Sequence, residues 1–185
     1  MKKALLAACL TILALQPTTH ARAEQLPVNL GASKITVDIQ SSLINTTATL
    51  KKFSGYLQHT GNDLTNAKVV LTSKGSDVSF GRLPIEQMFF VSSLMQAVSS
   101  DEISFESQSI ERVKEQYLIH GITTSGKHQE RISIPVMIAK DAAKKRYTFI
   151  TQYQRSGTAG NKSSQLGQML GPISTKGNIQ IVFGG

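Results

Sequence analysis

The sequence has a single cysteine, Cys9, and no tryptophan. Cys9 lies inside an apolar leader, so the rest of the chain has no thiol for a disulfide or for thiolate catalysis. Acidic residues number 12 against 20 lysines and arginines, and aromatic residues make up only 6%. Proteins that read nucleic acid place basic side chains among stacking aromatics on one face, and no such face is visible here. We therefore expect no nucleic-acid partner.

The motifs of common catalytic and metal centres are missing as well. No Gly-x-Ser-x-Gly occurs, and His59, His120 and His128 lack partners at a spacing that completes a metal site. Residues 121–128 resemble a phosphate-binding loop, but His128 stands where a Ser or Thr should hold magnesium, and a strand is expected next instead of a helix. We therefore predict no enzymatic activity, no catalytic residue, no metal site and no cofactor.

Residues 1–23 have the pattern of a secretory signal peptide. Lys2 and Lys3 precede an apolar run from Ala4 to Leu15, and Ala21-Arg22-Ala23 has small residues where a signal peptidase cleaves. A helix of this run reaches about 18 Å, against about 30 Å for a hydrocarbon core, so it is too short to span a membrane. We expect export to the periplasm and a mature chain that begins at Glu24. Leu6 to Cys9 imitates a lipoprotein cleavage box, which we interpret as coincidence.

Most of the remaining chain alternates apolar and polar residues, as strands do. Strands are expected around residues 35–39, 69–71, 103–105, 117–119, 132–138, 147–153 and 179–183, and the stretch 46–58 has room for another. Turn residues separate these runs, with no linker that divides the chain. We predict an all-β fold, an extended antiparallel barrel of about eight strands, formed by one domain over residues 24–185.

One strand carries the clearest prediction of an inward face. Ile132, Ile134, Val136 and Ile138 alternate with residues such as Met137, and a register slip of one residue would expose the whole apolar set. We expect this face to point into the barrel. The inward set then also includes aromatic and aliphatic residues of neighbouring strands, namely Phe105, Ile119 and Phe149.

Two segments depart from the alternation. Pro84 opens a stretch in which Ile85, Met88, Phe89 and Met95 recur at helical spacing, which predicts one short helical segment. We expect this segment to cover one end of the barrel or to pack against its core, and in addition it can form a flexible, Met- and Phe-rich wall of an apolar site. Residues 156–176 are rich in Gly, Ser and Gln, which predicts a long loop.

Several short segments occur in a familiar order. They are Ser33 to Val37, Lys52-Phe53-Ser54-Gly55, Ile103 to Ser107, Ile119-His120-Gly121-Ile122-Thr123 with the strand after it, and Gln154-Arg155-Ser156. From about Ser33 to the C-terminus the chain thereby resembles the YceI-like family of bacterial periplasmic proteins, also called polyisoprenoid-binding or lipocalin-like. Ala32, Met88, Leu94-Met95 and residues 157–159 depart from the family's pattern, so the resemblance is to a divergent member.

The resemblance implies a lipocalin-like barrel that holds a small-molecule lipid, an isoprenoid quinone or another polyisoprenoid or acyl chain. Together with the apolar pattern it predicts a ligand-binding set of Met88, Phe89, Leu94, Met95, Phe105, Ile119, Val136, Phe149, Tyr153 and Arg155. Tyr153 and Arg155 end a strand, so they are expected near one mouth of the barrel, where Arg155 either meets a polar head group or is a solvated charge.

The rival hypothesis is a barrel filled by its own side chains that serves as an interaction or stress module. A hydrolase without a recognisable motif is a weaker third option. The basic residues Lys140, Lys144, Lys145 and Arg146 gather at an expected hairpin turn, which we interpret as solvated, and a transient contact with a membrane surface is left open. A homodimer is also left open.

Overall fold

The computed structural model describes residues 23–42, 44–81, 102–158 and 172–185. Within these ranges eleven strands form one antiparallel sheet. They are β1 (Glu24–Pro27), β2 (Lys34–Gln40), β3 (Asn45–Leu50), β4 (Ser54–His59), β5 (Lys68–Lys74), β6 (Val78–Phe80), β7 (Glu102–Val113), β8 (Gln116–Ser125), β9 (His128–Asp141), β10 (Arg146–Thr158) and β11 (Pro172–Phe183). Two single-turn 3₁₀ helices, η1 (Leu30–Ala32) and η2 (Gly75–Asp77), precede β2 and β6.

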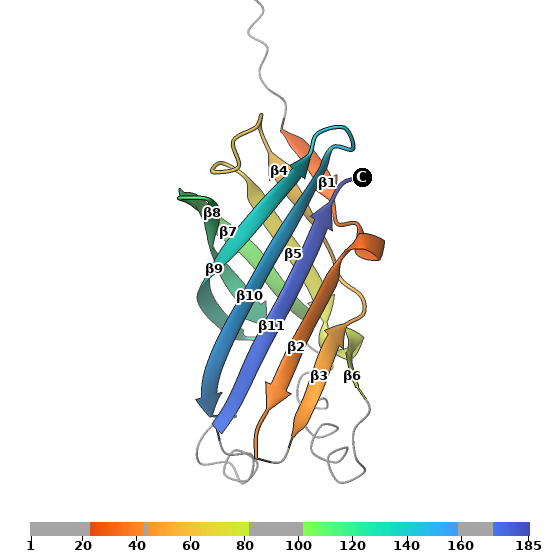
Figure 1. Ribbon diagram of the computed structural model, residues 1–185, viewed down its shortest axis with the longest axis vertical. Helices are drawn as coiled ribbons and strands as arrows, with labels where there is room; N and C mark the ends of the chain where they lie inside the picture. The colour runs from red at the N-terminus through yellow and green to blue at the C-terminus, as the bar shows by residue number, and fades with distance from the viewer. Residues whose placement is uncertain (1–22, 43, 82–101, 159–171) are drawn as a thin grey trace, which may run out of the picture.

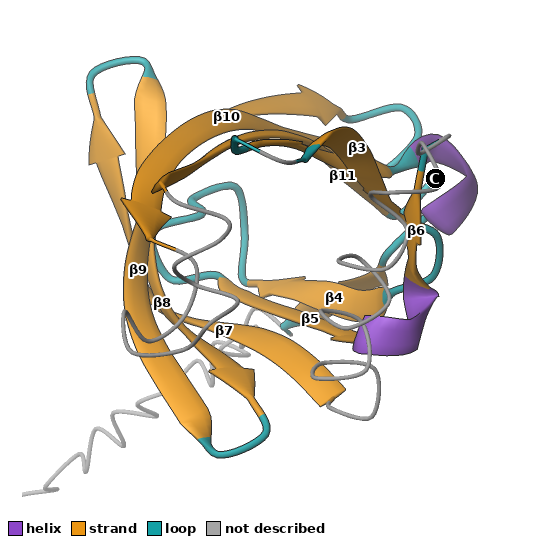
Figure 2. Ribbon diagram, turned by 90° about the horizontal axis from the view of Figure 1, so that it is seen from below, coloured by secondary structure: helices purple, strands orange, loops and turns teal. Residues whose placement is uncertain are grey.

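The sheet curls into a barrel. Its strand order is β1-β4-β5-β7-β8-β9-β10-β11-β2-β3-β6, and Figure 2 shows the strands surrounding a common axis. The end strand β1 returns to β11, because an isolated bridge joins Val28 to Phe183 and the Gly184 N–H donates to the Pro27 carbonyl at 2.9 Å. The barrel is therefore joined at its upper end, the end that carries the C-terminus at the top of Figure 1.

The all-β barrel class predicted from the sequence is confirmed, whereas the count of about eight strands was too low. The stretch 46–58 holds two strands, β3 and β4, and the short strands β1 and β6 were not predicted. Strands of four and three residues are too short to show an alternating pattern. Gly55 shows why β4 needs a glycine: a Cβ there would overlap the Val70 carbonyl of β5, and its φ is +153°.

The predicted inward face of β9 is confirmed. Val136 is 4% exposed and belongs to the core, and Ile134 and Ile138 pack against that core, whereas Met137 on the opposite face is 54% exposed. Ile119 and Phe149 are buried in the same core, and Phe105 packs against it. The alternating pattern alone therefore identified which side of these strands faces the barrel interior.

The predicted loop over residues 156–176 is wrong at both ends. β10 continues to Thr158 and β11 begins at Pro172, with Ser156 paired to Ser174 and Arg155 paired to Thr175. Strand pairing uses backbone groups that every residue except proline supplies, so polar residues and glycines extend a hairpin without an apolar pattern. The predicted helical segment from Pro84 to Met95 lies outside the described residues. Among those described, no helix is long and apolar enough to cross a bilayer.

Candidate functional site

The barrel interior divides into two halves with different packing. In the upper half the inward side chains form one buried cluster, in which Phe149 and Phe183 meet edge to face with ring centroids 5.1 Å apart. The cluster consists of Leu26, Phe53, Leu57, Leu64, Ala67, Val69, Ile110, Ile119, Val136, Tyr147, Phe149, Ile181 and Phe183. This half is filled by the protein's own side chains.

In the lower half the inward positions carry half-buried apolar side chains next to polar ones such as Thr123, Ser125 and Thr175. Strand register places both kinds on the same face as the upper cluster. We call the apolar members the lower wall; they are Val37, Ile39, Leu71, Phe80, Ile103, Phe105, Ile132 and Ile173. An inward apolar surface with incomplete burial is what a site for an apolar ligand requires.

Two glycines let aromatic rings lie along this inner surface. A Cβ at Gly121 of β8 would overlap the Phe105 ring of β7, and a Cβ at Gly177 of β11 would overlap the Tyr153 ring of β10. Each ring therefore rests over a neighbouring strand instead of extending across the barrel. Gly177 could not be recognised from the sequence, because its role depends on the pairing of Tyr153 with Gly177 across the β10–β11 ladder.

The ladder between β9 and β10 stops halfway down the barrel. Pairing runs from Arg146 with Asp141 to Ile150 with Met137, and the next part of β9 contains Pro135. Proline has no N–H to donate to a ladder, and the Pro135 carbonyl instead accepts a hydrogen bond from the Thr151 hydroxyl. Below this point β9 follows β8 while β10 follows β11, as Figure 1 shows. We call this separation the β9–β10 seam.

An ion pair crosses the β9–β10 seam near the lower end. Arg155 Nη1 lies 2.9 Å from Glu130 Oε1 and 3.1 Å from Oε2, with the two side chains 65% and 49% exposed. The hydrogen bond from Arg155, followed by its charge, lowers the pKa of Glu130. Arg155 is therefore a charge at the barrel's lower mouth that is paired through its Nη1. Glu130 could not be found from the sequence, because Glu130 and Arg155 meet only through the strand arrangement.

The predicted ligand-binding residues separate into three groups. Ile119, Val136 and Phe149 lie in the packed upper half, whereas Phe105, Tyr153 and Arg155 lie lower in the barrel. Tyr153 is 38% exposed, so it has free surface to offer a ligand. The third group, Met88, Phe89, Leu94 and Met95, lies outside the described residues.

Two polar arrangements bear on the predicted absence of a metal or catalytic site. Within the described residues, no group of three or more His, Cys, Asp or Glu side chains is arranged to hold a metal ion. His120 contacts Ser133 Oγ at 2.7 Å and Glu111 Oε1 at 3.7 Å.

Comparison with known proteins connects this arrangement to solved barrels. No protein family matches the chain by sequence, and no curated protein does. The crystal structure of Burkholderia cenocepacia BcnA is similar, with a TM-score of 0.62 and 17% identity over 84% of this chain and 98% of BcnA. A polyisoprenoid-binding domain from Saccharophagus degradans, implicated in plant cell wall breakdown, is similar with a TM-score of 0.58 and 12% identity over 88% and 99% of the two chains. The chain therefore has the all-β barrel fold of the YceI-like proteins that its sequence resembles.

Proposed function

We propose that the protein binds one long-chain amphiphile, an isoprenoid quinone or another polyisoprenoid or acyl lipid, inside the lower half of the barrel and acts as its carrier or reservoir. The observation that carries this proposal is the lower wall, an inward apolar surface that the protein's own described side chains leave half-buried. The similarity in fold to a polyisoprenoid-binding domain supports the same class of ligand.

The proposed pose follows from the polarity of the interior. The apolar chain lies against Phe105 and the rest of the lower wall, and burial contributes about 0.8 kcal/mol for each CH₂ group removed from water. The packed upper cluster, with Ile119, Val136 and Phe149, forms the floor that the chain reaches. The polar head stays at the lower mouth, where Arg155 and the Tyr153 hydroxyl offer hydrogen-bond donors.

Binding of this kind needs no catalytic group, so we propose a non-enzymatic role. We further propose that residues 1–23 direct the chain to the periplasm and are removed there. A protein that keeps the apolar part of a lipid out of water is suited to a compartment between two membranes. Export to the periplasm and lipid binding are consistent with each other, because a carrier has to share a compartment with its ligand.

The packed upper half favours a second candidate, a barrel whose interior is filled and which serves as an interaction module. The two candidates differ in whether the protein retains a lipid. The deciding experiment is extraction of protein purified from its own periplasm with organic solvent, followed by mass analysis of the extract. We expect a stoichiometric lipid with a long apolar chain, and binding of a fluorescent acyl probe by the emptied protein at micromolar concentration. If the extract contains no stoichiometric lipid and the probe does not bind, the second candidate replaces the first.

A further inference from the structure

The upper end of the barrel contains a polar hollow that the proposed function does not use. Its volume is about 260 Å³, and it lies between the start of β1, the turn after β4 and the β9–β10 turn. Its lining consists of Glu24, Leu26, His59, Gly61, Asn62, Lys140, Ala142, Lys145 and Tyr147. It lies at the opposite end of the barrel from the Arg155–Glu130 ion pair.

His59 forms part of the floor of this hollow and has one unsatisfied ring nitrogen. The residue is only 5% exposed, and its ring meets Tyr147 edge to face at 5.0 Å. Its Nδ1 donates to the Gly61 carbonyl at 2.8 Å, whereas the buried Nε2 has no hydrogen-bond partner. Glu24 Oε2 lies 4.0 Å from Nε2, which is too far for a hydrogen bond. A buried polar atom without a partner calls for an explanation, and a ligand atom in the hollow supplies one.

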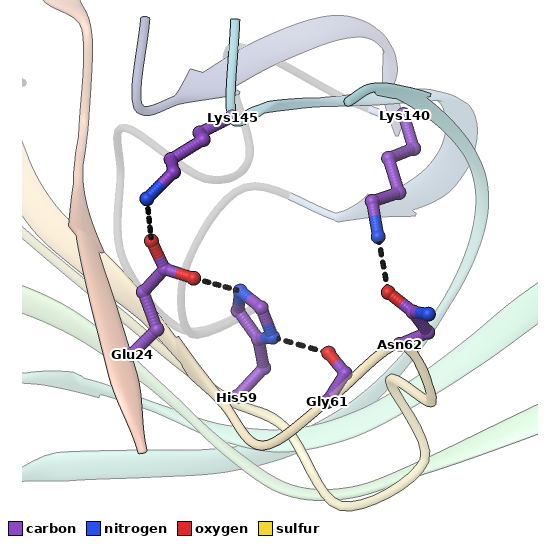
Figure 3. Close-up of polar contacts among 6 residues, drawn as sticks. All are labelled: Glu24, His59, Gly61, Asn62, Lys140 and Lys145. Carbon is purple, nitrogen blue, oxygen red and sulfur yellow. Dashed lines mark hydrogen bonds and ion pairs between the residues drawn. The ribbon is translucent and has the colours of Figure 1, made fainter. Parts of the chain in front are cut away.

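Two lysines extend over the hollow from the β9–β10 hairpin. Figure 3 shows Lys145 pointing to Glu24 and Lys140 pointing to Asn62, with His59 between these contacts. Lys145 Nζ lies 3.7 Å from Glu24 Oε1, and Lys140 Nζ lies 2.6 Å from Asn62 Oδ1 and 5.3 Å from the Tyr147 ring centre. Lys145 is therefore held only by a long contact with Glu24, and Lys140 is held by a neutral amide, so both ammonium groups can turn to an anion in the hollow.

We propose that this hollow binds a phosphate group, held by the ammonium groups of Lys140 and Lys145 and by Nε2 of His59. Lysine is a common ligand for phosphate oxygens, and hydrogen bonds between charged groups are the strong ones. Nδ1 of His59 already donates to a carbonyl, so its buried Nε2 is the ring atom left to meet the anion, either as a donor to a phosphate oxygen or as an acceptor from a P–OH group.

Charged groups reach the hollow from two elements. Glu24 approaches from β1, and Lys140 and Lys145 approach from the β9–β10 hairpin. Glu24 competes with the phosphate for Lys145 and Nε2, because it carries the same sign of charge. The phosphate group comes either from a free phosphate or from the head group of a lipid at a membrane surface.

Titration calorimetry with inorganic phosphate tests the site itself. We expect saturable binding at a fixed pH near neutrality. Lys145→Gln and Lys140→Gln should each weaken it about tenfold, because each removes a charged donor. Glu24→Gln should strengthen it by removing the competing carboxylate. Lys144→Gln is the matched control, since Lys144 is the neighbouring lysine of the same turn and does not line the hollow.

His59→Phe should also weaken binding, because it removes Nε2 while keeping an aromatic ring against Tyr147, and if this buried change prevents folding, the lysine variants decide. Vesicle binding distinguishes the two sources of phosphate. Vesicles of phosphatidylglycerol in phosphatidylcholine are compared with vesicles of phosphatidylcholine alone. Binding of the anionic vesicles with the same ranking of variants identifies a lipid head group, and phosphate binding without vesicle binding identifies a free anion. The proposal is overturned if neither probe binds, or if Lys144→Gln weakens binding as much as Lys145→Gln, since attraction would then be general rather than local.

Discussion

At the residue scale, the direction and size of single side chains decide how the barrel interior is packed. Val136 and Met137 are neighbours in the chain, yet one is almost fully buried and the other is 54% exposed. Gly121 and Gly177 have no side chain, and each leaves room for an aromatic ring from the adjacent strand. The shape of the inner surface therefore depends on these two glycines as well as on the apolar residues around them.

The burial of Val136 predicts a strong contrast between adjacent substitutions. Val136→Asp places an unpaired carboxylate inside the core, which should lower the free energy of unfolding by several kcal/mol. Met137→Asp adds the same charge on the solvent side and should have a small effect. Denaturant unfolding of both variants measures the difference. If the Val136 variant unfolds like the wild type while the Met137 variant collapses, the assignment of the inward face is wrong.

The contact between Gly177 and Tyr153 predicts that even a methyl group is costly there. Gly177→Ala should destabilise the protein by about 1–3 kcal/mol, because the added Cβ displaces the Tyr153 ring from the wall. Gly31→Ala is the control, since a Cβ at Gly31 meets only the Asn29 side chain at 3.7 Å. Thermal unfolding compares the two. Equal stability of both variants would contradict the close packing of Tyr153 on β11.

At the element scale, the β9–β10 seam is the most consequential feature of the sheet. These strands form one hairpin, but they pair with each other only near the turn and then follow different neighbours. Pro135 accounts for the position of the separation, because a ladder cannot use its missing N–H. The seam places Arg155 opposite Glu130, so a polar pair stands at the mouth of an apolar interior.

The ion pair across the seam predicts a local effect on titration. Arg155→Gln should raise the pKa of Glu130 toward the usual value for glutamate, because both its hydrogen bond and its positive charge are lost. The lowered pKa of Glu130 means that the pair stabilises the folded state above the unfolded pKa of glutamate, and this contribution is lost as the pH falls through the lowered value.

Both side chains are largely exposed, so the melting temperature should change little. Carboxyl NMR titration of the two proteins provides the measurement, with Glu106, which pairs with Lys68, as the internal control. An unchanged Glu130 titration in Arg155→Gln would show that the pair does not form in solution.

At the scale of the whole molecule, the barrel has two different ends. At the upper end β1 bonds to β11, the main core fills the interior and a polar hollow lies above it. The lower end carries the lower wall and the Arg155–Glu130 pair. In the proposed function, an amphiphile enters from below with its chain directed upward. The proposed phosphate site lies at the far end, so the two kinds of ligand do not compete for space.

Export predicts a defined mature N-terminus at this upper end. We expect cleavage after Ala23, which leaves Glu24 as the first residue of β1, with its side chain near Lys145 and His59. Intact-mass measurement of the periplasmic protein checks this, with the unprocessed chain from a cytoplasmic preparation as the reference. A diacylated N-terminus at Cys9 would show instead that the leader belongs to a lipoprotein.

The sequence by itself determined the fold class and the inward side of the long strands. Alternation is a local property of the chain, so Ile134, Val136 and Ile138 report the buried face without knowledge of any neighbour. Short or polar strands such as β1, β6 and the lower part of the β10–β11 hairpin lack this signal and were missed or interpreted as loop.

Only the tertiary structure decided which half of the interior is packed, which residues meet across the seam and where His59 lies. These features arise between residues far apart in the chain: Glu130 meets Arg155 and Glu24 meets Lys145. Strand order and register bring such pairs together, and no local pattern encodes that order. The burial of a residue shows in the apolar pattern of its own strand, whereas a binding site forms only where several strands come together.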